Sequence, residues 1–182
     1  MKTCDVNRVG SWFQTYSSIE FYIMDPREDE ILIEDIAHAL AYSCRYNGHC
    51  KYFHSVAMHS VLVSQVCKPE NALWGLLHDA SEAYTGDMVK PLKRHMEEFK
   101  RIEDQLMKTI CHKFGLPEEM PEDVDAADLS LLALERQYLM GEPPRPWNVL
   151  ERVEPADIKL VLLPPEDAEY IFLSRFQELT GA

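Results

Sequence analysis

The chain has 182 residues, of which 46% are hydrophobic and 27% charged, which is the size of one domain with a sizeable core and excludes a linker or a disordered tail. Its 31 acidic and 18 basic side chains give a net charge of −13, which disfavours a broad face for nucleic acid or an anionic membrane. An anionic ligand would therefore need a local source of positive charge.

The cysteines point to a reducing compartment. They are five in number, form no C-x-x-C pair and follow no secretory leader, so we expect reduced thiols in a cytoplasmic protein. Cys44 and Cys50 are the only close pair, and neither has a second cysteine at zinc-site spacing. No apolar run is long enough to cross a bilayer.

The first expected element is a short β-hairpin within residues 11–24, where aromatic, Thr and Ile residues are interrupted by Ser17 and Ser18. Every later element has a helical pattern. Apolar residues at spacings of three and four predict a helix over residues 33–44.

Ser55 is the expected N-cap of a second helix over residues 56–66. A third helix is predicted to begin at Pro69, to run without a break to about Tyr84 and to stop at Gly86. Apolar periodicity predicts a fourth helix that contains residues 99–110 and ends near Gly115.

A fifth helix is predicted after Pro121 and runs to about Tyr138. Six of the 11 prolines lie between Pro143 and Pro165, which predicts an extended, turn-rich connection. A last amphipathic helix covers residues 168–179. We therefore expect a single domain over residues 1–182, all-α with a short N-terminal β-hairpin.

Three of these helices carry ionisable side chains where a core would hold leucine. His78 and Glu82 are four residues apart and would share a helix face, with Asp79 offset by about 100°. His59 lies inside the second helix, and Asp128 falls on the apolar stripe of the fifth. Taken singly, each has an ordinary explanation: a hydrogen-bonded core histidine, a chance His-Asp pair, or a carboxylate paired with an arginine.

Taken together, two imidazoles and two carboxylates suit a divalent transition metal. Nitrogen ligands favour Zn, Mn or Co over Ca, and carboxylates keep the site hard enough for phosphate oxygen, with Mg as a further candidate. Such an ion would supply the positive charge that an anionic substrate needs and could lower the pKa of a bound water.

These residues also carry a resemblance. His59, the pair His78-Asp79 and Asp128 stand in the order H, HD, D, and the stretches HDASEAYTGD (residues 78–87) and CRYNGH (residues 44–49) extend the match. With these motifs the chain resembles the HD-domain metal-dependent phosphohydrolases. Within them it resembles a phage and prophage subgroup that includes DatZ-type dATP triphosphohydrolases, and it is similar to HD-domain 5′-deoxynucleotidases.

The resemblance implies that His59, His78, Asp79 and Asp128 hold the catalytic metal and that Glu82 orients or deprotonates the attacking water. One position departs from the subgroup. Relatives often have an acidic or amide residue just before the first metal histidine, and Met58 stands there.

For the substrate, the resemblance implies that Arg45 contacts phosphate and sugar, that Tyr46 lies beside the base, and that Asp87 lies near the deoxyribose. His49 either lines the pocket or has a hydrogen-bonded structural role. Lys90 and Lys93 belong to a basic run that begins where the third helix ends; they either form a solvated surface patch or contact the outer phosphates.

The implied reaction is hydrolysis of a phosphate ester in a deoxynucleotide. A dNTP triphosphohydrolase that prefers dATP and releases deoxynucleoside and triphosphate is the first candidate, and a 5′-deoxynucleotidase acting on dNMPs is the alternative. A domain that binds a nucleotide or a partner without turnover is a second alternative. The resemblance also implies a homo-oligomer, a dimer or hexamer, in the host cytoplasm if the protein is viral, with no nucleic-acid or membrane partner.

Overall fold

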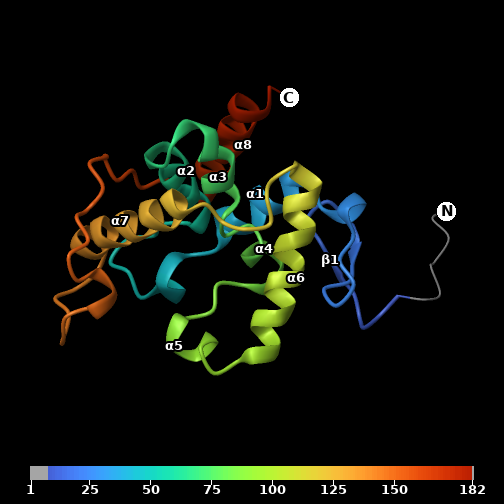
Figure 1. Ribbon diagram of the computed structural model, residues 1–182, viewed down its shortest axis with the longest axis horizontal. Helices are drawn as coiled ribbons and strands as arrows, with labels where there is room; N and C mark the ends of the chain where they lie inside the picture. Colours follow the sequence, from blue (N-terminus) through green and yellow to red (C-terminus); the bar gives the residue numbers. More distant parts are fainter. Residues whose placement is uncertain (1–7, 182) are drawn as a thin grey trace.

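Helices form most of the computed structural model, which describes residues 8–181 (Figure 1). Two short strands near the N-terminus pair antiparallel, with Phe13 opposite Phe21. This arrangement confirms the predicted class, all-α with an N-terminal hairpin. Of the five cysteines, Cys4 lies outside the described residues.

The strands are followed by α-helices and by short 3-10 helices, labelled η. In chain order the elements are β1 (Phe13–Gln14), β2 (Glu20–Phe21), η1 (Glu28–Glu30), α1 (Ile33–Tyr42), η2 (Arg45–Gly48), α2 (Val56–Val66), η3 (Pro69–Asn71), α3 (Ala72–Leu77), α4 (Glu82–Thr85), α5 (Lys90–Lys93), α6 (Glu97–Phe114), α7 (Glu122–Leu139), η4 (Asn148–Leu150) and α8 (Pro165–Thr180).

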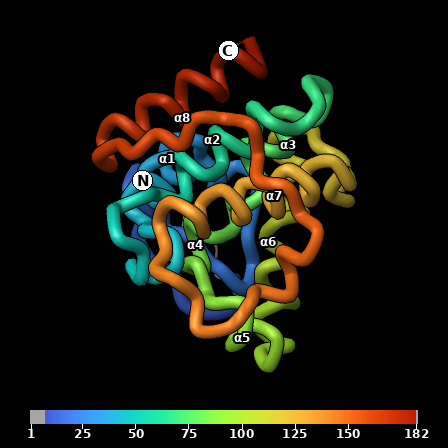
Figure 2. The backbone as a smooth tube through the Cα atoms, turned by 90° about the vertical axis from the view of Figure 1, so that its left-hand side faces the viewer, coloured from blue at the N-terminus to red at the C-terminus, as the bar shows by residue number. Residues whose placement is uncertain are grey.

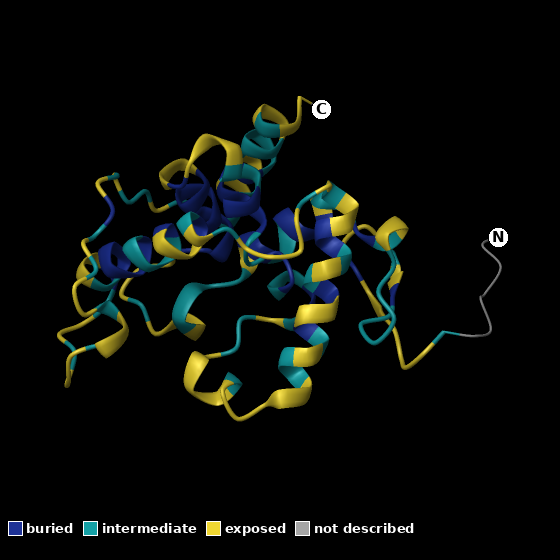
Figure 3. Cartoon of the chain, viewed as in Figure 1, coloured by how far each residue is buried: buried dark blue, intermediate teal, exposed yellow. Residues whose placement is uncertain are grey.

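Helix α2 is the centre of the core. Its residues from Val56 to Ser64 are all buried, as expected for a helix that is apolar around most of its surface. It packs against α1, α3, α7 and α8. Buried residues are concentrated where α1, α2 and α3 meet, whereas α5 is largely exposed (Figure 3).

The predicted unbroken third helix is wrong. The chain instead forms η3, α3 and α4, with a turn at residues 78–81 between α3 and α4. The His78 ring donates from Nδ1 to Gly75 O at 2.8 Å, and that carbonyl would accept the N–H of Asp79 in a continuous helix. The N–H groups of Ala80 and Glu82 bond three residues back, which tightens the turn.

The second half of the chain follows the prediction more closely. Helix α6 ends at Gly115, whose φ of 68° is the left-handed value expected after a helix end. Helix α5 was not predicted. The proline-rich connection runs along the outside of α7 (Figure 2), where Ala156 N–H donates to Ser130 O at 3.0 Å. No helix within residues 8–181 is long and apolar enough to cross a membrane.

Candidate metal centre

Three elements bring His59, His78, Asp79 and Asp128 together. His59 comes from α2, Asp128 from α7, and His78 and Asp79 from the turn after α3. His59 Nε2 lies 3.0 Å from Asp128 Oδ1 and 4.0 Å from Asp79 Oδ2. His78 Nε2 lies 3.2 Å from Asp79 Oδ2. Ligand atoms of His59, His78 and Asp128 all lie within 4.8 Å of one another.

The donor atoms of the two imidazoles suit a metal ion. The other nitrogen of each ring is engaged, because His59 Nδ1 bonds to Glu135 Oε1 at 2.6 Å and His78 Nδ1 bonds to Gly75 O. Both Nε2 atoms are buried and make no hydrogen bond of suitable geometry, although each lies within 3.2 Å of a carboxylate oxygen. A ring that donates from Nδ1 leaves its Nε2 lone pair for a metal, so His59, His78 and Asp128 could bind a metal ion.

Without a metal, the pKa values of both carboxylates of this cluster are lowered. Burial raises the pKa of Asp79, but the His78, His59 and Arg45 charges outweigh it and hold the pKa well below its usual range. Burial likewise raises the pKa of Asp128, but the adjacent His59 lowers it to about 2. Two charged carboxylates are suitable ligands for a divalent cation.

Without a metal, the same carboxylates favour a proton on His59. Burial and the Arg45 charge lower the pKa of His59, but Glu135 and Asp128 outweigh them and raise it to about 9. Without an ion, the cluster therefore favours positive charge at His59.

Glu82 begins α4 at the edge of this cluster. Its Oε2 is buried without a hydrogen-bond partner, and it lines a cavity of about 400 Å³ together with His78 and Asp79. Burial, then the charges of Asp79 and Asp87, raise the pKa of Glu82 well above its usual value. A carboxyl group with a raised pKa beside an open cavity is suited to accept and release a proton.

The loop η2 places a guanidinium beside the cluster. Arg45 Nη1 lies 3.7 Å from Asp79 Oδ2, and its side chain is only 11% exposed. Tyr46 (φ 58°) and Asn47 (φ 49°) both adopt left-handed backbone, an uncommon pair for residues other than glycine. Tyr46 OH donates to Glu135 Oε2 at 2.7 Å, which holds the loop against α7.

The other predicted substrate residues differ in exposure and in their partners. Lys90 is 69% exposed, with Nζ 3.9 Å from Asp128 Oδ2. Lys93 Nζ pairs with Glu103 Oε2 at 2.5 Å. Asp87 is half-buried near the cluster, and burial raises its pKa. His49 is exposed at the end of η2, so its pocket role stays a prediction.

The chain was compared with known proteins, and no family model matches it. It is 40% identical over 171 residues to "Uncharacterized protein YfdR" of Escherichia coli, an alignment that covers 93% of this chain and 96% of the relative. The chain belongs to the YfdR family. It is also 32% identical to "Uncharacterized protein RCAP_rcc00048" of Rhodobacter capsulatus, over 93% of this chain and 95% of that protein. Similarity to YfdR therefore extends over nearly the whole chain.

One residue of the site in this YfdR-family chain was missed by the sequence interpretation. Glu135 is completely buried on α7 and contacts both His59 and the η2 loop. The available signal was its position seven residues after Asp128, two helical turns away on nearly the same face.

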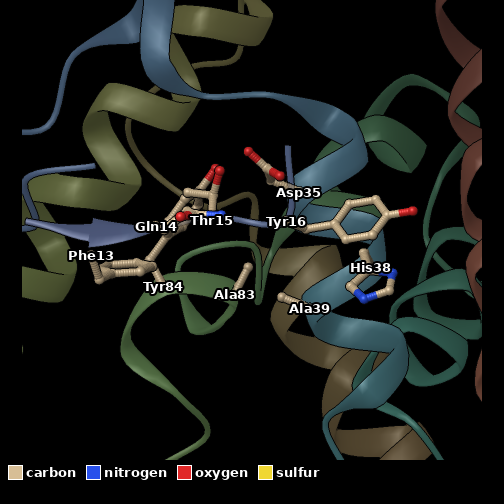
Figure 4. A pocket seen from close by; sticks show the side chains of 9 residues that line it. All are labelled: Phe13, Gln14, Thr15, Tyr16, Asp35, His38, Ala39, Ala83 and Tyr84. Atoms are coloured by element: carbon tan, nitrogen blue, oxygen red, sulfur yellow. The ribbon is translucent and has the colours of Figure 1, made fainter. Parts of the chain in front are cut away.

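A second cavity in the YfdR-family chain, of about 200 Å³, lies between the hairpin, α1 and α4 (Figure 4). Tyr16 stacks on His38 there, with ring centroids 3.7 Å apart, and His38 Nδ1 bonds to Glu169 Oε2 at 2.9 Å. No predicted site residue lines this cavity, so the chemistry proposed below belongs to the His59 cluster.

Proposed function

We propose that the chain is a metal-dependent phosphohydrolase of the HD-domain superfamily that acts on a deoxynucleotide. The observation that carries the proposal is the convergence of His59, His78, Asp79 and Asp128 from three elements. Beside the two carboxylates, the Nε2 atoms of both imidazoles are buried and make no hydrogen bond of suitable geometry. The H, HD, D order and the 78–87 stretch support the assignment to this superfamily.

In the proposed site, His59, His78, Asp79 and Asp128 hold one divalent ion, for which Mn, Co, Zn and Mg are the candidates. When bound, the ion would polarise a phosphoryl oxygen and lower the pKa of a water. Arg45 contacts the substrate phosphate, since its guanidinium already lies beside Asp79 and its planar donors match phosphate oxygens.

Glu82 accepts the proton of the attacking water. The water oxygen bonds to phosphorus, the ester bond to the 5′ oxygen breaks, and the departing deoxynucleoside takes up a proton. A monophosphate yields deoxynucleoside and phosphate, whereas attack at the α-phosphorus of a triphosphate yields deoxynucleoside and triphosphate. The same groups serve both reactions.

Substrates with one phosphate and with three phosphates are both candidates, and the lysines after Gly86 bear on the choice. Gripping the outer phosphates of a dNTP such as dATP would need free lysines, but Lys93 pairs with Glu103, and Lys100 pairs with Glu97 at 2.6 Å. Lys90 is the cation of this run that lies nearest Asp128. Lys93 would have to leave Glu103 to contact an outer phosphate, whereas the Lys90 side chain is exposed, so the product assay decides between the 5′-deoxynucleotidase and the triphosphohydrolase.

The test is a product assay on the metal-loaded protein with dNMP, dNTP and ribonucleotide panels, resolved by chromatography. Deoxynucleoside and phosphate from dNMPs would support the nucleotidase, and intact triphosphate from dATP would support the triphosphohydrolase. If no substrate is hydrolysed with Mn, Co, Zn or Mg, the enzyme proposal is wrong and a nucleotide-binding domain without turnover takes its place.

The Glu82→Gln variant separates catalysis from binding. It removes the proton acceptor while leaving the four proposed ligands in place, so turnover should fall by at least about 100-fold with metal affinity nearly unchanged. Asp104→Gln serves as a control, because Asp104 lines the same cavity without a proposed role. Unchanged turnover in Glu82→Gln would refute the mechanism.

A further inference from the structure

The carboxylate of Glu135 is shared between two groups of partners. Oε1 accepts a hydrogen bond from His59 Nδ1 at 2.6 Å and lies 3.4 Å from His54 Nε2. Oε2 accepts from Tyr46 OH at 2.7 Å and lies 3.2 Å from Arg45 Nη2. The side chain is fully buried, so water does not compete with these contacts.

Oε1 therefore contacts His59, one of the proposed metal ligands. A carboxylate that accepts from Nδ1–H selects the tautomer whose Nε2 has a free lone pair, and His59 Nε2 is the atom that lies 3.0 Å from Asp128. Such carboxylate–imidazole contacts also fix the ring orientation.

Oε2 contacts Arg45 and Tyr46, the residues proposed to bind the substrate. Arg45 and Tyr46 begin the η2 loop, whose left-handed residues need external contacts to hold their conformation. Arg45 lies between two carboxylates, with Glu135 on one side and Asp79 on the other. Glu135 thus joins the loop to the helix that carries Asp128.

We propose that Glu135 is a positioning residue that couples the two halves of the site: one oxygen fixes His59 for metal binding, and the other holds Arg45 and Tyr46 for contact with the nucleotide. This inference rests on the proposed function. It extends that function by assigning a role to a residue outside the H, HD, D pattern.

The Glu135→Gln variant tests the coupling. A carboxamide has one acceptor oxygen, and its NH2 group would face either the His59 N–H or the Arg45 and Tyr46 donors, so it cannot serve both sides. Calorimetric titration with Zn²⁺ alone should show affinity reduced by about 10–100-fold. Glu169→Gln is the matched control, because Glu169 also bonds to a histidine Nδ1, that of His38, and it should keep wild-type affinity.

Two further measurements do not depend on the folding of that variant. The ¹⁵N shifts of the Zn²⁺-loaded wild type should show His59 bound through Nε2 with a proton on Nδ1. Tyr46→Phe, in a Glu82→Gln background that prevents turnover, should bind dAMP about tenfold more weakly while its Zn²⁺ affinity changes less than twofold.

The inference is overturned if Glu135→Gln folds and binds both Zn²⁺ and, in the Glu82→Gln background, dAMP within twofold of its parent, if His59 binds through Nδ1, or if Tyr46→Phe lowers Zn²⁺ affinity as much as Glu135→Gln does. None of the metal measurements needs hydrolysis. A wild type that binds Zn²⁺ as described but hydrolyses no nucleotide would refute the proposed function and leave the His59 role of Glu135 standing.

Discussion

Ser55 Oγ accepts a hydrogen bond from the backbone N–H of Met58 at 3.1 Å and caps α2 one turn before His59. Ser55→Ala should lower the free energy of unfolding by about 1 kcal/mol, because it leaves that buried N–H without a partner. Chemical denaturation measures the difference. Ser60→Ala is the control, since the buried Ser60 hydroxyl has no hydrogen-bond partner and its loss should cost less. A larger loss in Ser60→Ala would contradict the cap assignment.

Metal binding should stabilise the fold, because the proposed ligands come from α2, α7 and the turn after α3 and meet only in the folded chain. At a metal concentration 100 times Kd, the expected gain is about 2.7 kcal/mol. Thermal unfolding with Mn²⁺ or Co²⁺, against the same protein in a chelator, measures it. Asp128→Asn should lose most of the gain, and an equal gain in that variant would place the ion elsewhere.

Gly75 allows α2 and α3 to approach closely. A Cβ there would lie 2.7 Å from Cys67 Sγ and 3.1 Å from Ser64 Cα, so Gly75→Ala should destabilise the protein by about 1–3 kcal/mol despite its better helix propensity. Combining it with Cys67→Ala should restore part of the loss, since only the thiol contact is relieved. Thermal unfolding measures these differences. Gly141→Ala is the control, because a Cβ there meets nothing within 4 Å, and it should be close to neutral.

Asp123 links α7 to the chain before α3. It accepts hydrogen bonds from Lys68 N–H at 2.9 Å and from Asn71 Nδ2 at 2.6 Å, and the Lys68 N–H is the main cause of its lowered pKa. A lowered folded-state pKa means that the stabilisation is complete above the usual carboxyl pKa and is lost as pH falls through the folded value.

Asp123→Asn should therefore have a lower Tm than wild type at pH 6, and the difference should shrink as the pH falls below about 4. Asp125→Asn, an exposed carboxylate in the same first turn of α7, controls for the general helix-terminus effect. A Tm difference that stays constant down to pH 2 would show that the Asp123 charge does not matter.

Local signals were enough to predict most helices. The Ser55 cap, the Gly115 stop and the apolar periodicity of α6 and α7 involve neighbouring residues, so they can be read without knowing the fold. The break at residues 78–81 could not be predicted in this way, because it depends on the His78 side chain taking the Gly75 carbonyl.

The site, like the helices, was predictable where the signal is local and was missed where it depends on distant contacts. Ionisable side chains at His59, His78 and Asp128, where a core would hold leucine, suggested one metal site, and ligand atoms of these three residues do lie close together. Glu135 was missed because its contacts are with His59 and Arg45, which lie 76 and 90 residues away in the sequence. For Lys93 the sequence left a surface patch and a phosphate contact open, because charge alone does not reveal its pairing with Glu103.

The seven-residue interval between Asp128 and Glu135 on α7 limits how this chain can change in length. One residue inserted between them would rotate Glu135 by about 100° relative to Asp128, so that Glu135 could no longer contact His59 while Asp128 stays in place. An insertion near Gly141, beyond the end of α7, would leave both carboxylates in register. The spacing along α7 is therefore as much a part of the site as the residues themselves.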